Sequence, residues 1–220
     1  MIEIISTGDG SHTLRNTQIG ETYHSVHGAV QESIHVFIRY GFQHVIASGK
    51  GSINLLEVGF GTGLNAFLTL KESSVRKVRV NYTALEPHPV EEEIWAQLNY
   101  ATTEDEIDLF RRIHEAQWHE ATFLQPWFSL RKLKHHVQEA ELASSHFDLI
   151  YFDAFAPEKQ PDMWTPDTLS LVAGCMKQGS ALVTYCAKGQ LKRDLRTLGF
   201  NVESLQGPPG KREMIRAIKA

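Results

Sequence analysis

The sequence predicts an α/β protein built on a mostly parallel sheet. From Ser52 onward, short apolar runs alternate with stretches of helical periodicity, which is the pattern of parallel strands joined by crossover helices. A glycine-rich turn, residues 59–63, connects the first apolar run directly to the first of these helices. Near the end of the sequence, Gly207-Pro208-Pro209-Gly210 reverses the chain before a last apolar run.

The same pattern places the individual elements in order along the chain. The predicted strands are Ile53–Val58, Val78–Leu85, one strand within Leu130–Val137, Phe147–Phe152, Ala181–Cys186, Phe200–Leu205 and Met214–Ile218. The predicted helices of this part are Leu64–Lys71 and Gly189–Leu198. The second strand ends at Glu86-Pro87, because proline restricts the residue before it to extended conformations.

Two regions lie outside this alternating core. Residues 1–51 are expected to form an N-terminal extension with a helix around Val30–Tyr40. Residues 88–129 are expected to form a helical insertion, with helices in Val90–Leu98 and Glu104–Trp118. Because the sequence holds no internal repeat, low-complexity tract or linker, we expect one domain spanning residues 1–220.

Composition argues against several classes of protein. No segment offers the roughly 18 apolar residues of a membrane span, and Met1–Gly10 has neither the basic leader nor the apolar stretch of a signal peptide. We therefore expect a cytoplasmic protein that does not bind a membrane. Cys175 and Cys186 form no CxxC pattern, and the histidines lack metal-binding spacing, so neither disulfides nor a metal are expected.

The net charge of -4 argues against a protein that holds nucleic acid by its overall charge. A local basic face is still compatible with the sequence. The basic residues gather in two runs: Lys188, Lys192, Arg193 and Arg196, and then Lys211, Arg212, Arg216 and Lys219. A solvated helix face and an ordinary charged tail explain these runs equally well.

The glycine turn has the residue types of a nucleotide-like cofactor site. The segment is Glu57-Val58-Gly59-Phe60-Gly61-Thr62-Gly63-Leu64-Asn65. Glycines let the backbone turn sharply and approach a ligand closely, and the following helix N-terminus offers free N–H groups. The dinucleotide fingerprint G-x-G-x-x-G needs a third glycine one residue later, which disfavours a nicotinamide cofactor. A purely structural turn is the alternative.

This segment resembles motif I of the class I S-adenosylmethionine-dependent methyltransferases. The resemblance implies a Rossmann-like, mostly parallel seven-stranded sheet with one antiparallel strand, and S-adenosylmethionine as the cofactor. It assigns Glu86, at the end of strand two, to the ribose hydroxyls. The family's adenine-contacting acid has two candidates, Gln138 and Glu139, and we assign Glu139. The cofactor-binding residues implied in this way are Glu57, Gly59, Phe60, Gly61, Thr62, Gly63, Asn65, Glu86, Pro87 and Glu139.

Three segments narrow the resemblance. Residues 57–65, 152–164 and 210–214 together are similar to the tRNA 5-methylaminomethyl-2-thiouridine methyltransferases, over nearly the whole chain. The resemblance implies methyl transfer to the 5-aminomethyl nitrogen of the wobble uridine, with tRNA as the partner. In bacteria this activity occurs fused to a flavin oxidase domain or alone, and a chain ending at Ala220 is expected to be the stand-alone form. A methyltransferase acting on a protein or a small molecule, or an adenosyl-binding module without activity, are the alternatives.

The resemblance also suggests the substrate site. Asp153 follows strand four at the edge where open parallel sheets bind ligands, so it is the expected catalytic residue. An alkylammonium, with a pKa near 10, must lose a proton before its nitrogen can attack a methyl carbon. A carboxylate with a pKa near 4 is a poor base, so we favour Asp153 as an acceptor that orients the amine, with proton loss to water. The expected substrate-binding residues are Glu32, Phe155, Pro157, Trp164, Lys188, Lys211 and Arg212, the last two as contacts to tRNA phosphate.

Overall fold

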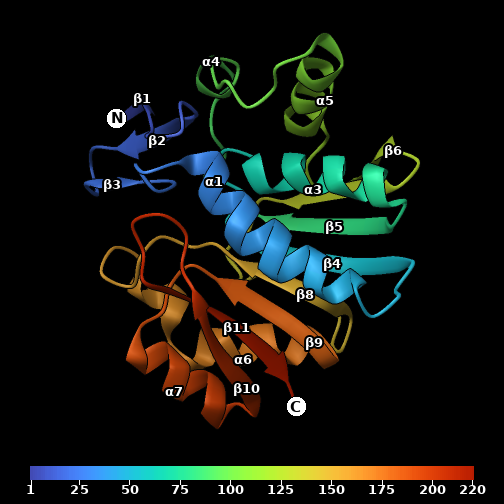
Figure 1. The fold of residues 1–220 in the computed structure, drawn as a ribbon, viewed down its shortest axis with the longest axis vertical. Coiled ribbons are helices and arrows are strands. Elements are labelled where there is room, and N and C mark those ends of the chain that lie inside the picture. The colour runs from blue at the N-terminus through green and yellow to red at the C-terminus, as the bar shows by residue number, and fades with distance from the viewer.

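A computed structural model describes residues 1–220. Its centre is an eight-stranded sheet in the order β10-β11-β9-β8-β4-β5-β7-β6 (Figure 1). The strands are β4 Ser52–Val58, β5 Arg79–Leu85, β6 Ala121–Gln125, β7 Phe128–Leu133, β8 Phe147–Phe152, β9 Met176–Thr184, β10 Phe200–Gln206 and β11 Glu213–Lys219. The five strands from β9 to β7 pair in parallel, whereas β11 is antiparallel to both of its neighbours and β6 is antiparallel to β7.

The expected fold class is confirmed, with one correction to the number of strands. All seven predicted strands are present, and β11 is the expected antiparallel strand. β6 is an eighth strand inside the segment that was expected to be helical. It forms because Pro126-Trp127 makes a two-residue connection that turns residues 121–125 back along β7. β9 also starts earlier than expected, at Met176, because the polar residues 177–180 hide the strand from a search for apolar runs.

Helices cover both faces of the sheet. One face carries a continuous helical rod and α3 Leu64–Arg76; the rod consists of α1 Ala29–Ser33, the π-helix η1 Ile34–Gln43 and α2 His44–Ile46. The other face carries α6 Pro166–Cys175 and α7 Gly189–Thr197. Successive strand residues alternate between the faces, so Leu55 packs in the first core and Leu56 in the second. Full burial of one leucine side chain contributes about 2 kcal/mol.

The regions outside the core meet beside the glycine turn. The N-terminal segment forms a small antiparallel sheet, β1 Ile2–Ser6, β2 His12–Asn16 and β3 Glu21–Thr22, which the sequence analysis did not predict. The insertion contains α4 Glu92–Trp95 and α5 Glu104–Glu115, near the predicted helices. The two regions touch, since the N–H of His12 donates to Asn99 Oδ1 over 2.7 Å.

The remaining element is the 3-10 helix η2 Pro161–Trp164, which precedes α6. None of the helices has both the length and the apolar character needed to cross a membrane.

Candidate functional site

The glycine turn, residues 59–63, follows β4 and lies against the end of β5. The N–H groups of Gly59 and Phe60 both donate to the carbonyl of Leu85, over 3.0 and 3.1 Å. Gly59 has a φ of +95°, and a Cβ at this position would lie 2.5 Å from the carbonyl oxygen of Asp153. Only glycine permits this approach of two backbone segments. The turn after β4 and the segment after β8 therefore meet at one edge of the sheet.

Glu86 closes the turn from the end of β5. Its Oε2 accepts the N–H of Gly61 and its Oε1 accepts the N–H of His88, each over 2.9 Å. Burial raises the pKa of this carboxyl, while the two backbone donors act in the opposite direction. A carboxylate offers about four lone-pair sites, so each oxygen can accept one further hydrogen bond. Glu86 can therefore anchor the turn and receive two hydroxyl groups of a ligand at the same time.

A cavity of about 480 Å³ opens beside the turn. Its volume lies within the range of about 300–1,000 Å³ that is usual for small-molecule sites. The predicted cofactor residues that line it are Gly59, Phe60, Gly61, Thr62, Glu86 and Pro87. Gly63 lies outside the cavity wall, as the N-cap of α3 with a φ of +72°. The rest of the wall includes Tyr23 from the N-terminal segment and Ile94 from the insertion, which gives both outer regions a part in the site.

Glu57 and Asn65, two further predicted cofactor residues, lie beneath the cavity. Glu57 is fully buried, and neither of its carboxyl oxygens has a hydrogen-bond partner. Burial raises the pKa of Glu57 well above its usual value, and the nearby Asp153 raises it further. Tyr82 and Asn65 lie near enough to favour the charged form of Glu57, but neither makes a well-formed hydrogen bond to its carboxyl group. An unpaired buried carboxyl is costly in the protein alone and suits a ligand that carries an ammonium group.

Glu139 does not reach the cavity. It is exposed, whereas His135, His136 and Val137 form the cavity wall after β7. The two histidines come one residue after a parallel strand, and this position is a signal that could have identified them. The uncertain end of strand three concealed it. No three metal-ligating side chains gather into a site for an ion.

Asp153 faces the cavity from the segment after β8. Burial raises the pKa of this carboxyl to about 7, and the carboxylate of Glu32 adds to the shift. A hydrogen bond from Asn65 and the charge of Lys211 act in the opposite direction. This pKa lies above the ordinary value near 4 expected from the sequence, at which a carboxylate is a poor base. A carboxyl that titrates near neutral pH can both accept and release a proton under physiological conditions.

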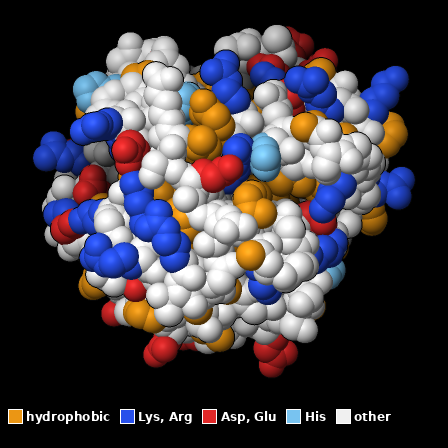
Figure 2. All heavy atoms as spheres, turned by 60° about the horizontal axis from the view of Figure 1, so that its bottom comes forward, with side chains coloured by type: hydrophobic (Ala, Val, Ile, Leu, Met, Phe, Trp, Pro, Cys, Tyr) orange, Lys and Arg blue, Asp and Glu red, His pale blue; other side chains and the backbone are white.

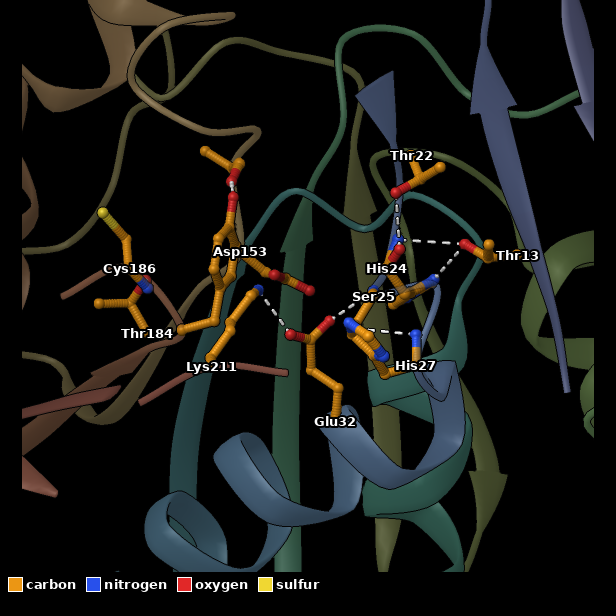
Figure 3. Close-up of polar contacts among 12 residues, drawn as sticks. Thr13, Thr22, His24, Ser25, His27, Glu32, Asp153, Thr184, Cys186 and Lys211 are labelled. Carbon is orange, nitrogen blue, oxygen red and sulfur yellow. Dashed lines mark hydrogen bonds and ion pairs between the residues drawn. The ribbon is translucent and has the colours of Figure 1, made fainter. Parts of the chain in front are cut away.

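Glu32 and Lys211 lie together beside Asp153, although 179 positions separate them in the sequence. Lys211 Nζ donates to Glu32 Oε1 over 2.6 Å, and Glu32 Oε2 accepts the N–H of Ser25 over 2.8 Å. Figure 3 shows these side chains pointing toward one another, with the carboxyl of Asp153 alongside. Lys211 Nζ also lies 3.7 Å from the ring centroid of Tyr185. The sequence analysis missed Tyr185, although it directly follows strand β9, as Asp153 follows β8.

The predicted aromatic residues lie at different depths. Phe155 lines the cavity, and its ring meets the ring of Tyr23 edge-on with 5.0 Å between centroids. Trp164 is buried behind it, where its Nε1 donates to the carbonyl of Phe155 over 2.8 Å and its ring packs against Phe152. Trp164 therefore supports the wall without reaching the cavity. Tyr23 is a wall residue that was outside the predicted set.

The predicted basic residues line a second cavity, of about 450 Å³, together with Pro157 and Tyr185. Lys188 forms an ion pair with Glu158, and Lys211 forms one with Glu32. Arg212 is exposed and has no carboxylate partner. Figure 2 shows Lys and Arg side chains in patches mixed with acidic ones, not as one continuous basic surface. Of these cations, Arg212 is therefore the best available to a phosphate group.

Comparisons with known proteins show the family and the fold of this chain. The family described as S-adenosyl-L-methionine-dependent methyltransferase has a model that matches residues 91–220. The crystal structure of MNMC2 from Aquifex aeolicus superimposes with a TM-score of 0.82 and 31% sequence identity, and the match covers 99% of this chain and 70% of that chain.

Two curated relatives are tRNA 5-methylaminomethyl-2-thiouridine biosynthesis bifunctional proteins MnmC. The protein from Pseudomonas putida (strain W619) is 27% identical over 90% of this chain and 32% of its own length. The protein from Ralstonia nicotianae (strain ATCC BAA-1114 / GMI1000) is 29% identical over 88% of this chain and 31% of its own length. The chain thus spans about a third of the length of these relatives.

Proposed function

This chain belongs to the S-adenosyl-L-methionine-dependent methyltransferases, in the family that includes MNMC2 of Aquifex aeolicus, and from this we propose a specific reaction. The protein transfers a methyl group to the aminomethyl nitrogen of 5-aminomethyl-2-thiouridine, or its uridine counterpart, at the tRNA wobble position. The observation that carries the proposal is the location of Asp153: it lines the cavity beside the glycine turn and adjoins the Glu32–Lys211 pair. An amine held there would lie between the cofactor and the basic residues.

S-adenosylmethionine, bound along the glycine turn, supplies the methyl group. Glu86 would accept hydrogen bonds from the two ribose hydroxyls, because each of its oxygens has a free lone pair after binding a backbone N–H. Glu57 would face the ammonium group of the methionine part, which would compensate its unpaired burial. The glycines at 59 and 61 leave room along the backbone for the chain between these two ends.

Asp153 would hold the substrate amine and take its surplus proton. An ammonium ion has no lone pair, so its proton must leave before the nitrogen can react. With a pKa raised to about 7, Asp153 is a better acceptor than an ordinary aspartate, and it can return the proton to water. This raised pKa supports a role for Asp153 in proton transfer in addition to orienting the amine. Phe155 and Tyr23 would wall the amine and limit the access of water.

The tRNA would bind through local contacts, because the net charge of -4 provides no general attraction for phosphate. Arg212 and Lys188 line the second cavity next to Tyr185, and both could contact phosphate groups that flank the wobble nucleotide. Such contacts fix the position of the nucleic acid without reading its sequence.

Purified protein, labelled S-adenosylmethionine and tRNA from cells that lack this protein provide the test. We expect label in tRNA, and nucleoside mass spectrometry that shows aminomethyl-uridine converted to methylaminomethyl-uridine. Asp153→Asn should lower the rate at least about 100-fold, as expected for loss of a proton acceptor. Its affinity for the cofactor, measured by calorimetry, should stay close to that of the parent. Label that enters protein or small molecules of a cell extract, but no tRNA, would instead indicate a methyltransferase with another substrate.

A further inference from the structure

Lys211 differs from the other basic residues near the second cavity, because its ammonium group is directed inward. It is enclosed by the carboxylate of Glu32, 2.6 Å away, and the ring face of Tyr185, whose centroid is 3.7 Å away. Glu32 is almost completely buried, with 6% of its side chain exposed, compared with 32% for Lys211. Both an anion and an aromatic face stabilise a cation at this place. A residue held in this way is poorly placed to contact phosphate in solvent.

The backbone around Lys211 is also held firmly. The N–H of Lys211 donates to the carbonyl of Pro208 over 2.9 Å, and the N–H of Gly207 donates to that of Arg212 over 3.1 Å. Gly210 packs so closely on His27 that a Cβ there would lie 2.0 Å from the ring. The turn between β10 and β11 is thus fixed against the segment before α1, and it presents Lys211 at a defined position beside Asp153.

We propose that Lys211 is a positioning residue of the methyl transfer: clamped by Glu32 over Tyr185, it holds a fixed positive charge that favours ionised Asp153 and an uncharged substrate amine. This inference rests on the proposed function. It assigns Lys211 a different role from the phosphate contact expected from the sequence, which leaves Arg212 for that role.

The chemistry explains why such a charge is useful. The proton of the substrate ammonium moves to an oxygen of Asp153 and then to water, and the freed lone pair forms the N–C bond as the C–S bond breaks and its electron pair stays on sulfur. Lys211 neither gains nor loses a proton in this sequence. A like charge within about 4–6 Å disfavours an ammonium ion, and an opposite charge favours a carboxylate, each typically by one pKa unit or more. The cation of Lys211 therefore assists both halves of the proton transfer and opposes the larger effect of Glu32 on Asp153.

Other charged and titratable groups surround Lys211 and Asp153, and the test must separate their effects on the pKa of Asp153. They are Glu57 from β4, Glu32 from α1, His24 and Tyr23 from the segment before α1, Glu86 after β5, and Tyr185 and Cys186 after β9. Glu32 influences Asp153 in the opposite direction to Lys211. The two partners of one ion pair should therefore give opposite results when each is neutralised.

The experiment is the pH dependence of kcat/KM for tRNA methylation by Lys211→Met, Lys211→Arg and Glu32→Gln. Lys211→Met should move the midpoint of the acid limb upward by about one unit, since it removes the cation. Lys211→Arg keeps the charge and should keep the midpoint, and Glu32→Gln should move it downward. A carbon NMR titration of the Asp153 carboxyl, assigned with Asp153→Asn, should show the same order without any turnover. The affinity of Lys211→Met for tRNA should remain within about threefold of the parent, because charge contacts to phosphate are not its role.

The inference fails if Lys211→Met weakens tRNA binding and leaves the midpoint in place, because Lys211 is then a phosphate contact. It also fails if the variants lose activity without opposite shifts, which would indicate a structural ion pair. If Lys211→Met does not fold, Lys211→Gln, which also removes the cation, takes its place, with the same upward shift expected. A parent protein that methylates no tRNA at any pH refutes the proposed function, while the NMR titration still reports whether Lys211 controls Asp153.

Discussion

The side-chain amide of Asn65 donates a hydrogen bond to Asp153 Oδ2 over 2.8 Å and so joins the first turn of α3 to the segment after β8. This hydrogen bond lowers the pKa of Asp153, because a donor stabilises the ionised carboxylate more than the protonated carboxyl. The glycine turn lies between the two segments. The same contact thus links the geometry of the cofactor cavity to the charge of the proposed catalytic residue.

Asn65→Leu should therefore raise the pKa of Asp153 above its present value of about 7. We expect the acid limb of the kcat/KM profile to move upward by about one unit, and activity at pH 7 to fall about fivefold, because the ionised fraction of Asp153 falls by that factor. Thr69→Val is a matched control, because Thr69 is buried one turn later in α3 and bonds the carbonyl of Asn65 but not Asp153. An unchanged midpoint in Asn65→Leu would contradict the role assigned to this hydrogen bond.

The buried carboxyl of Glu57 should make the free energy of unfolding depend on pH. Its pKa in the folded protein lies above its usual value, so its contribution to stability is complete below about pH 4 and is lost as the pH rises toward the folded pKa. Glu57→Gln removes this loss. Urea unfolding at neutral pH should show the ligand-free variant to be more stable than the parent by about 1 kcal/mol or more, with little difference near pH 4.

The same Glu57→Gln variant should bind S-adenosylmethionine about tenfold more weakly in calorimetry, because the neutral amide no longer attracts an ammonium group. If the free energy of unfolding changed with pH in the same way in variant and parent, burial of Glu57 would not cost stability in the free protein. Undiminished affinity would show that Glu57 does not face the cofactor.

Gly59 and Gly49 offer a matched pair of glycine-to-alanine substitutions. Both have positive φ, +95° and +83°, so alanine at either place pays a similar backbone cost of about 1 kcal/mol. Only at Gly59 would the new methyl group collide with the backbone, 2.5 Å from the carbonyl of Asp153. We expect Gly59→Ala to lose clearly more stability in urea unfolding than Gly49→Ala, and to lose most of its cofactor affinity. Equal losses of stability in the two variants would argue against the close approach of Gly59 to the carbonyl of Asp153.

Arg212→Ala should weaken tRNA binding and reduce the slope of log affinity against log salt by about one, as expected for one lost phosphate contact. Arg79→Ala is the control, since Arg79 is also an exposed arginine but lies at the amino end of β5, on the opposite edge of the sheet. Filter binding over a range of salt concentrations measures the tRNA affinity and its salt dependence for both variants. A slope that is unchanged in Arg212→Ala, or reduced equally in Arg79→Ala, would move the tRNA contact away from this cavity.

The sequence was sufficient for features that are local. The segment from Glu57 to Asn65 contains a strand end, a turn and a helix start in one continuous stretch, and Asp153 follows an unbroken apolar strand. Because open parallel sheets bind ligands beyond the carboxyl ends of their strands, the sequence was enough to place both segments at the same edge. The choice of Glu139 had weaker support, because the end of strand three is poorly marked, and the structure places this residue outside the cavity wall. Likewise, β6 belongs to a hairpin whose turn, Pro126-Trp127, is not one of the strong hairpin signals.

Features that depend on distant segments could not be predicted. Burial by the folded chain raises the pKa of Asp153, and Glu32 adds to the shift. The inward position of Lys211 depends on Glu32 and Tyr185, and these three residues come from separate parts of the chain. In sequence, Lys211 beside Arg212 is simply part of a basic run. Only the fold distinguishes a lysine that is enclosed by an anion and a ring from an arginine that faces solvent.

The contact between Glu32 and Lys211 also bears on the order of synthesis. A nascent chain that has not yet produced β11 already contains the glycine turn, Glu86 and Asp153, but it lacks the partner of Glu32. Until the β10–β11 hairpin has been synthesised and has docked, Glu32 has no cationic partner, so its burial would be uncompensated before that step. Formation of the ion pair beside Asp153 therefore depends on two residues that are synthesised 179 positions apart.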